Sequence, residues 1–317
     1  MQRVLVWSGL LSLLLWAWLS WPLPRYMTSG ISSGAGLEAT SLQPLQPGDH
    51  LQFLYYCRLA QDMLAGQTPL FYNLYEFHTG ADSSCFQPDT YYFPFSFLYA
   101  AGAWLVGMAG GWNLAGFLSL WGTCLFTWLL ARRYVPQAWL AGLAGGLAMA
   151  LPFRWINLCG GSPAGMAMMW IPALWLGLDI AIRDKASRGG WLAGLAILLA
   201  RWTDMHVFFF GALSIPCWGL LALSAEDKAW CSGATWRAIS RALLPTAGLA
   251  LVALILPLLF EALTHSVIGA ATPAAQRTWS EITLYSPKWQ GLFAWRDLDV
   301  SNHIFIGYAA PAIIVLG

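Results

Sequence analysis

Residues 113–133 read NLAGFLSLWGTCLFTWLLARR, and this stretch decides the class of fold. Residues 113–131 carry no charged side chain, and two arginines follow directly. A helix needs about 20 mostly apolar residues to cross the hydrocarbon core of a bilayer, and this run is long enough. The stretch therefore predicts a membrane-spanning helix.

The whole chain has the composition of a membrane protein. Hydrophobic residues make up 58% of its 317 residues and charged residues 10%, against about 25% charged residues in an average soluble domain. So little polar surface cannot cover a soluble protein of this size. This excludes a soluble enzyme, a nucleic-acid-binding protein and a disordered chain. The net charge of +1 gives no sign of a nucleic-acid partner, and the six cysteines lack the spacing of a metal site.

Further apolar runs predict a single all-α, polytopic membrane helix bundle over residues 1–317. The first run has a positive start at Arg3, as a signal peptide would, but no small-residue cleavage site follows, so we expect a retained anchor. The last run ends at Gly317 within a span, so we expect the chain to be incomplete at its C-terminus. Besides residues 113–131, the expected spans are about 4–21, 137–153, 164–182, 189–203, 205–223, 242–262 and the incomplete 303–317.

Residues 91–112 are apolar enough to cross, but the distribution of basic residues argues against it. Basic residues concentrate in short cytoplasmic loops. With a cytoplasmic N-terminus and a segment 91–112 that is interfacial or re-entrant, two large loops at about 22–112 and 263–302 lie outside the cytoplasm. Nine basic residues then share the cytoplasmic side in short loops: Arg3, Arg132, Arg133, Arg183, Lys185, Arg188, Lys228, Arg237 and Arg241.

The first large loop contains an expected amphipathic surface helix. Residues 44–66 read PLQPGDHLQFLYYCRLAQDMLAG, with Asp49 at the N-cap position and Gly66 at the C-cap position. We expect a polar stripe and an opposite apolar face: His50, Arg58, Gln61 and Asp62 against Phe53, Tyr56, Leu59, Ala60, Met63 and Leu64. Asp49 has two compatible interpretations, as a helix cap or as a carboxylate base at the lipid–water boundary.

The order of these features resembles GT-C fold membrane glycosyltransferases, closest to the bacterial YfhO-like group. In that superfamily one span precedes an outside loop with an Asp, then an amphipathic helix ending near Gly, then a Tyr/Pro-rich approach to a surface helix. Asp49, Gly66, Pro69 and the run Tyr91-Tyr92-Phe93-Pro94 stand at those places. The resemblance continues through NLAGFLSLWGTCLFTWLLARRYV, LAGGLAMALPFRWINLCGGSPAGMAMMWIPALWLGLDIAIR and TWSEITLYSPKWQGLFAWRDLDVSNHIFIGY.

The resemblance implies transfer of a sugar from a polyprenyl-phosphate donor to an extracytoplasmic acceptor. Asp49 would be the catalytic residue, accepting a proton from the acceptor hydroxyl or orienting it. Cationic groups would steady the departing phosphate: His50 and Lys288 are candidates, and so is Arg154, unless Arg154 only extends to the interface as a snorkelling side chain. The turn with Arg154 lacks the second acidic residue of many relatives, so we expect no metal or other cofactor.

Residues 201–206, Arg-Trp-Thr-Asp-Met-His, form a second polar cluster at an expected tight turn. Ionisable residues at membrane depth are costly and are candidates for function. Arg201, Asp204 and His206 are therefore expected to bind substrate. The alternative is structural: an Arg201–Asp204 pair that closes the turn, with His206 hydrogen-bonded nearby.

Two other functions stay open. A lipid or glycan transporter would show inverted repeats or spans broken at corresponding points, and the sequence shows neither. A non-catalytic membrane protein of the same fold would tolerate Asp49→Asn. For all three we expect a multi-pass protein of the cell (inner) membrane with membrane lipid as a partner. For the transferase we also expect the active site on the extracytoplasmic face, and the sequence does not predict the oligomeric state.

Overall fold

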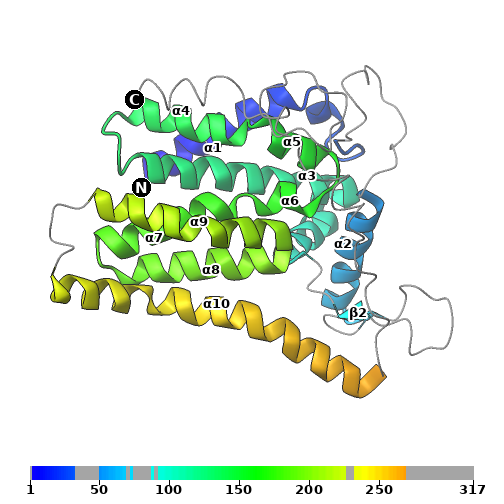
Figure 1. The fold of residues 1–317 in the computed structure, drawn as a ribbon. Helices are drawn as coiled ribbons and strands as arrows, with labels where there is room; N and C mark the ends of the chain where they lie inside the picture. Colours follow the sequence, from blue (N-terminus) through cyan, green and yellow to red (C-terminus); the bar gives the residue numbers. More distant parts are fainter. Residues whose placement is uncertain are drawn as a thin grey trace, which may run out of the picture.

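The computed structural model describes residues 2–32, 50–68, 72–73, 87–88, 92–225 and 232–268. The regular secondary structure in this part of the chain is helical apart from a short antiparallel pair of strands, β1 and β2 (Figure 1). The elements in chain order are α1 (Gln2–Leu19), the 3-10 helix η1 (Leu23–Tyr26), α2 (His50–Leu64), β1 (Tyr72–Asn73), β2 (Gln87–Pro88), α3 (Phe95–Ala131), α4 (Ala138–Met149), α5 (Pro152–Cys159), α6 (Pro163–Ala167), α7 (Trp170–Arg183), α8 (Ser187–Thr203), α9 (Met205–Ser224) and α10 (Gly233–Ile268).

Five helical stretches are long and apolar enough to cross a membrane. They are α1, α3, residues 163–183, α9 and residues 233–259. Large apolar side chains of α1, α9 and α10 are exposed, as expected of helices that face lipid. The prediction of a multi-pass helical membrane protein is confirmed at this level, whereas the bilayer and its two sides are not part of the structure.

Helix α3 folds back on itself at Gly107. Gly107 has φ 83° and ψ 169°, a conformation open essentially only to glycine. A Cβ on Gly111 would lie 2.6 Å from the carbonyl oxygen of Tyr99, and one on Gly102 would lie 2.8 Å from the Cα of Gly111. The arm at 95–106 would be about 18 Å long as a regular helix, too short for a hydrocarbon core of about 30 Å. This arm lies within the segment expected to be interfacial or re-entrant.

The region expected as a span at 137–153 is bent: α4 covers most of it, and α5 begins near its end. Helices α4 and α5 meet at an angle of 43°, and Pro152 begins the second. Proline lacks the backbone N–H that would continue the hydrogen-bond ladder of α4. The bend turns α5 toward α3, which positions Arg154 inside the protein.

Helices α7, α8 and α10 pack through small residues. Gly177 and Gly189 lie at the α7–α8 contact, and Gly190 faces the backbone of Ala242 in α10. The Thr246 hydroxyl donates to the carbonyl oxygen of Gly190 at 2.9 Å. Small residues allow this close approach because lipid gives little hydrophobic drive for helix association.

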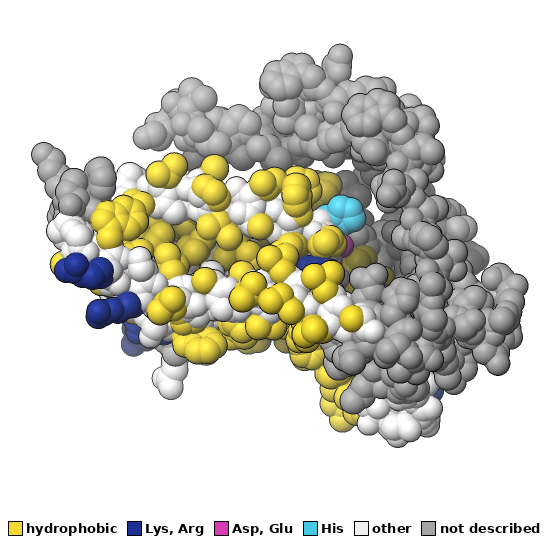
Figure 2. All heavy atoms as spheres, turned by 60° about the horizontal axis from the view of Figure 1, so that its bottom comes forward, with side chains coloured by type: hydrophobic (Ala, Val, Ile, Leu, Met, Phe, Trp, Pro, Cys, Tyr) yellow, Lys and Arg dark blue, Asp and Glu magenta, His cyan; other side chains and the backbone are white. Residues whose placement is uncertain are grey.

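The basic residues that were expected on one side of the membrane do share one end of the bundle. Helices α3, α7 and α9 end there, and α1, α4, α8 and α10 begin there (Figure 1). Figure 2 shows Lys and Arg side chains gathered at the left end of the yellow apolar face and a His side chain toward the other end. We call the left end, which carries Arg3, Arg132, Arg133, Arg183, Lys185, Arg188, Arg237 and Arg241, the basic end; Lys228 lies outside the described residues.

Candidate functional site

Helix α2 lies against α3 at the end opposite the basic end. The Phe53 ring packs edge-on against Trp112, with centroids 4.8 Å apart, and the His50 ring lies 6.2 Å from the same indole. Gly66, with φ 71°, follows the helix as the expected C-cap glycine. The docking surface of α2 therefore carries both aromatic side chains and a histidine.

The expected faces of α2 were wrong for two polar residues. His50 and Gln61 are buried together with Phe53, while Leu64 is exposed. His50 lies three residues before Phe53 and seven before Cys57, and these spacings place all three on one helical face. Trp112 is also buried, and Phe53 of α2 packs against it.

The turn after α5 closes over the first residue of α2. Gly161 has φ 74°, and a Cβ there would lie 2.5 Å from the backbone nitrogen of His50 and 2.7 Å from its Cγ. Neither ring nitrogen of His50, which is 2% exposed, has a hydrogen-bond partner in the described part of the chain. A buried imidazole without partners is costly, so this position favours a ligand or water contact.

Arg154 is the second buried polar side chain of this region. Its Nη2 donates to the Ser119 hydroxyl at 2.6 Å, and that hydroxyl donates to the Met166 carbonyl oxygen at 2.6 Å. Its Nε and Nη1 have no partner among the described residues. Arg154 is 2% exposed, so the snorkelling interpretation is wrong: the bend before α5 turns the side chain into the protein.

His50 and Arg154 contact the same face of α3. Trp112 and Ser119 are seven residues apart, which is two helical turns and about 10 Å along the axis. Ala115, fully buried between these turns, faces the same way. An imidazole and a guanidinium with unused donors thus line one helical face, which is a favourable environment for an anion.

The turn expected at residues 203–205 is the junction of α8 and α9. The Asp204 carboxylate accepts from the backbone N–H of Val207 at 2.9 Å and so caps α9. The His206 ring is largely exposed, with its Nδ1 3.7 Å from Asp204 Oδ1. This geometry favours the structural role for Asp204, and it leaves the expected roles of Arg201, Asp204 and His206 in substrate binding untested.

Residues 92 and 93 connect the two polar regions. The Tyr92 ring lies 4.4 Å from that of Phe53, and the Phe93 ring lies 5.4 Å from that of Trp202. The Thr203 hydroxyl is 2.9 Å from the Phe93 carbonyl oxygen. The approach to α3 therefore bridges α2 and the α8–α9 junction.

Asp49 and Lys288 lie outside the described residues, so the structure places neither of them. Among the residues that it does describe, no group of three or more His, Cys, Asp or Glu side chains could hold a metal ion. Ser119, which fixes Arg154, was not among the residues expected from the sequence. A hydroxyl in an apolar run was its only signal.

A cluster of ion pairs at the basic end was also not expected from the sequence. Asp179, fully buried in α7, accepts hydrogen bonds from Arg133 Nε and the Tyr134 hydroxyl, and Arg183 Nη1 lies 3.7 Å from it. Arg133 also donates to both carboxylate oxygens of Asp184, at 2.7 and 3.2 Å. The cluster joins the connection after α3 to the end of α7, far from His50.

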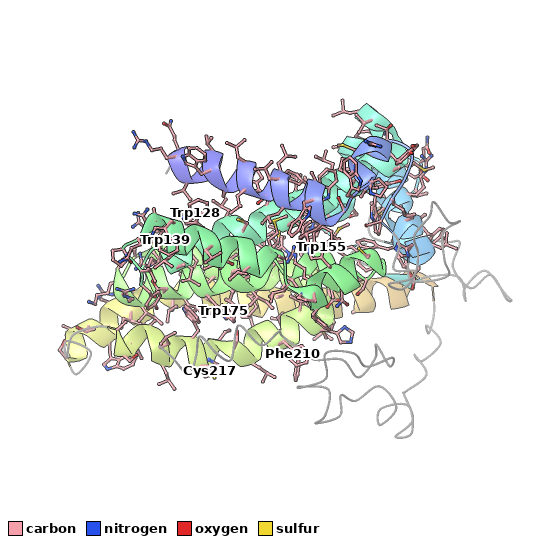
Figure 3. All side chains as sticks on the ribbon, turned by 90° about the horizontal axis from the view of Figure 1, so that it is seen from above. Trp128, Trp139, Trp155, Trp175, Phe210 and Cys217 are labelled. Carbon is pink, nitrogen blue, oxygen red and sulfur yellow. The ribbon has the colours of Figure 1, made fainter. Side chains whose placement is uncertain are left out.

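Side chains of α7 and α9 take inner and outer positions in the bundle. Trp175 lies between α7 and α9 and stacks on Trp218, with ring centroids 4.9 Å apart (Figure 3). Phe210 and Cys217 point away from the bundle on the outer side of α9 (Figure 3). Trp218 also packs edge-on against Tyr134, whose hydroxyl bonds Asp179, so this stack lies beside the cluster.

No family model matches this chain, and no curated protein or solved structure shows significant similarity to it.

Proposed function

We propose that the protein is a membrane glycosyltransferase of GT-C type that uses a polyprenyl-phosphate sugar. One observation carries the proposal: Arg154 is buried with two unpartnered nitrogens on the face of α3 that also holds His50. Such a guanidinium suits the phosphate of a lipid-linked donor, since fixed cationic groups stabilise the charge that develops on a departing phosphate. The position of His50 at the start of α2 links this face to Asp49, the preceding residue in the sequence.

In this proposal each residue has one task. Asp49 accepts the proton of the acceptor hydroxyl as that oxygen attacks the anomeric carbon, and the bond to the donor phosphate breaks. Arg154 holds the phosphate, and His50 lies on the same face of α3, next to Asp49 in the sequence. The site faces the extracytoplasmic leaflet, and the basic end faces the cytoplasm together with the N-terminus, in accordance with the positive-inside pattern.

A transferase assay with the full chain tests the proposal. The purified protein in detergent is mixed with radiolabelled polyprenyl-phosphate sugars and lipid or glycan acceptors, and wild type is compared with Asp49→Asn and Arg154→Gln. We expect transfer to fall about 10²- to 10⁴-fold without the base and about 10²- to 10³-fold without the guanidinium. Arg154→Lys, which keeps the charge, should retain more transfer than Arg154→Gln.

Arg188→Gln is the matched control, because its side chain is 77% exposed at the basic end. It should transfer sugar as wild type does. Each variant is first checked for monodisperse elution, so that loss of folding is separated from loss of chemistry. Equal transfer by wild type and Asp49→Asn would remove Asp49 from the mechanism. Absence of transfer with every donor, together with donor-dependent uptake into vesicles, would favour a transporter.

A further inference from the structure

The basic end carries more positive charge than its acidic residues neutralise. Among the described residues, Asp179 and Asp184 are the only acidic side chains there, and both pair with Arg133. Arg183 lies beside Asp179, and Arg188 Nη2 is 3.5 Å from Asp184. Both acids are therefore occupied within the cluster.

Four arginines remain outside this cluster, and one of them, Arg3, lies at the start of α1. The side chains of Arg132, Arg237 and Arg241 are exposed and make no ion pair or hydrogen bond with any other residue that the structure describes. They come from two different helical regions, the end of α3 and the first turns of α10. Their charge is available to a partner.

Exposed tryptophans stand at the same end of the helices. Trp139 begins α4, Trp191 lies in the second turn of α8, and Trp236 lies in the first turn of α10, and their exposed fractions are 68%, 54% and 45%. Indole rings prefer the headgroup level of a bilayer. The tryptophans therefore indicate the depth at which the unpaired guanidinium groups meet lipid.

We propose that the basic end binds anionic phospholipid headgroups through Arg132, Arg237 and Arg241. A phosphodiester headgroup with net negative charge complements exposed guanidinium groups, and a zwitterionic headgroup does so less well. Glu226, Asp227 and Lys228, in the connection before α10, lie outside the described residues and change the local sum by one negative charge. The inference does not depend on the proposed transferase activity.

Lipid-dependent thermal stability tests this proposal. The full chain in neutral detergent is titrated with phosphatidylglycerol or phosphatidylcholine, and its unfolding temperature is followed. We expect phosphatidylglycerol to raise the unfolding temperature more than phosphatidylcholine does, with an effect that weakens as salt increases. Each basic residue near a charged surface contributes about fivefold in affinity, so Arg237→Gln with Arg241→Gln should weaken phosphatidylglycerol binding about 25-fold.

The matched control replaces two arginines at the other end, Arg25→Gln with Arg58→Gln, and should keep the phosphatidylglycerol response. Equal responses to the two lipids, or equal losses in the two double variants, would overturn the proposal. If the first double variant does not purify as a folded protein, the single variants Arg237→Gln and Arg132→Gln are compared with Arg25→Gln by native mass spectrometry of bound lipid. Equal lipid retention in these single variants would also refute the proposal.

Discussion

Replacing Asp179 with alanine should destabilise the bundle strongly. The carboxylate is fully buried and accepts from Arg133 Nε and the Tyr134 hydroxyl. Removing one partner of a buried ion pair costs about 3–5 kcal/mol, because the other charge stays behind without compensation. Arg133 keeps its two bonds to Asp184 and is 22% exposed. We therefore expect the lower end of that range, about 3 kcal/mol.

Unfolding in mixed micelles, with increasing dodecyl sulfate and tryptophan fluorescence as the signal, measures this loss. The control is Asp184→Ala: that side chain is 32% exposed, and exposed pairs contribute about 1 kcal/mol or less. The destabilisation caused by Asp179→Asn should fall between those of Asp179→Ala and Asp184→Ala, because asparagine keeps an oxygen acceptor but loses the charge. If Asp179→Ala stays within about 0.5 kcal/mol of wild type, or loses no more than Asp184→Ala, the reasoning about the buried pair is wrong.

Three other predictions follow from single positions. Gly161→Ala should lower the unfolding temperature and perturb His50, because its φ of 74° disfavours a side chain and the new Cβ would meet the His50 backbone; unchanged stability would contradict this close contact. Hydrogen bonds from Arg133 hold the pKa of the Asp184 carboxyl below its usual value. The contribution of Asp184 to stability is therefore present above about pH 4 and is lost as the pH falls further. The Asp184→Asn variant should not show this loss of stability in an acid titration. Ser119→Ala should cost about 1–3 kcal/mol, since it removes the one described partner of buried Arg154, and thermal unfolding beside the neutral control Ser224→Ala measures it.

Composition and hydropathy predict the class of fold because lipid imposes length and apolarity on every span. They do not predict where a span breaks. Pro152 marked the end of an expected span, yet the bend before it places Arg154 inside the protein, and this depends on the fit of α5 against α3. The local sequence around an arginine does not distinguish a side chain that extends to the membrane interface from one that is buried inside the protein.

The polar residues of α2 show a different limit. Assigning His50 to a polar stripe followed residue type, whereas its spacing from Phe53 and Cys57 put it on the apolar face. Helical periodicity, applied without regard to residue type, places His50 on the buried face. Asp179 was missed because its partners, Arg133 and Tyr134, lie about 45 residues away in the chain, a separation that helical periodicity does not address.

The reversal within α3 has a consequence for how this architecture can change over generations. Gly102 and Gly111 meet backbone to backbone, and Gly107 holds a torsion closed to other residues. Side chains that contact substrate can be substituted in related proteins while the fold is kept. At these three positions only glycine fits the observed backbone. We therefore expect the spacing Gly-x4-Gly-x3-Gly within an apolar run to identify distant homologues, including homologues whose active-site residues differ.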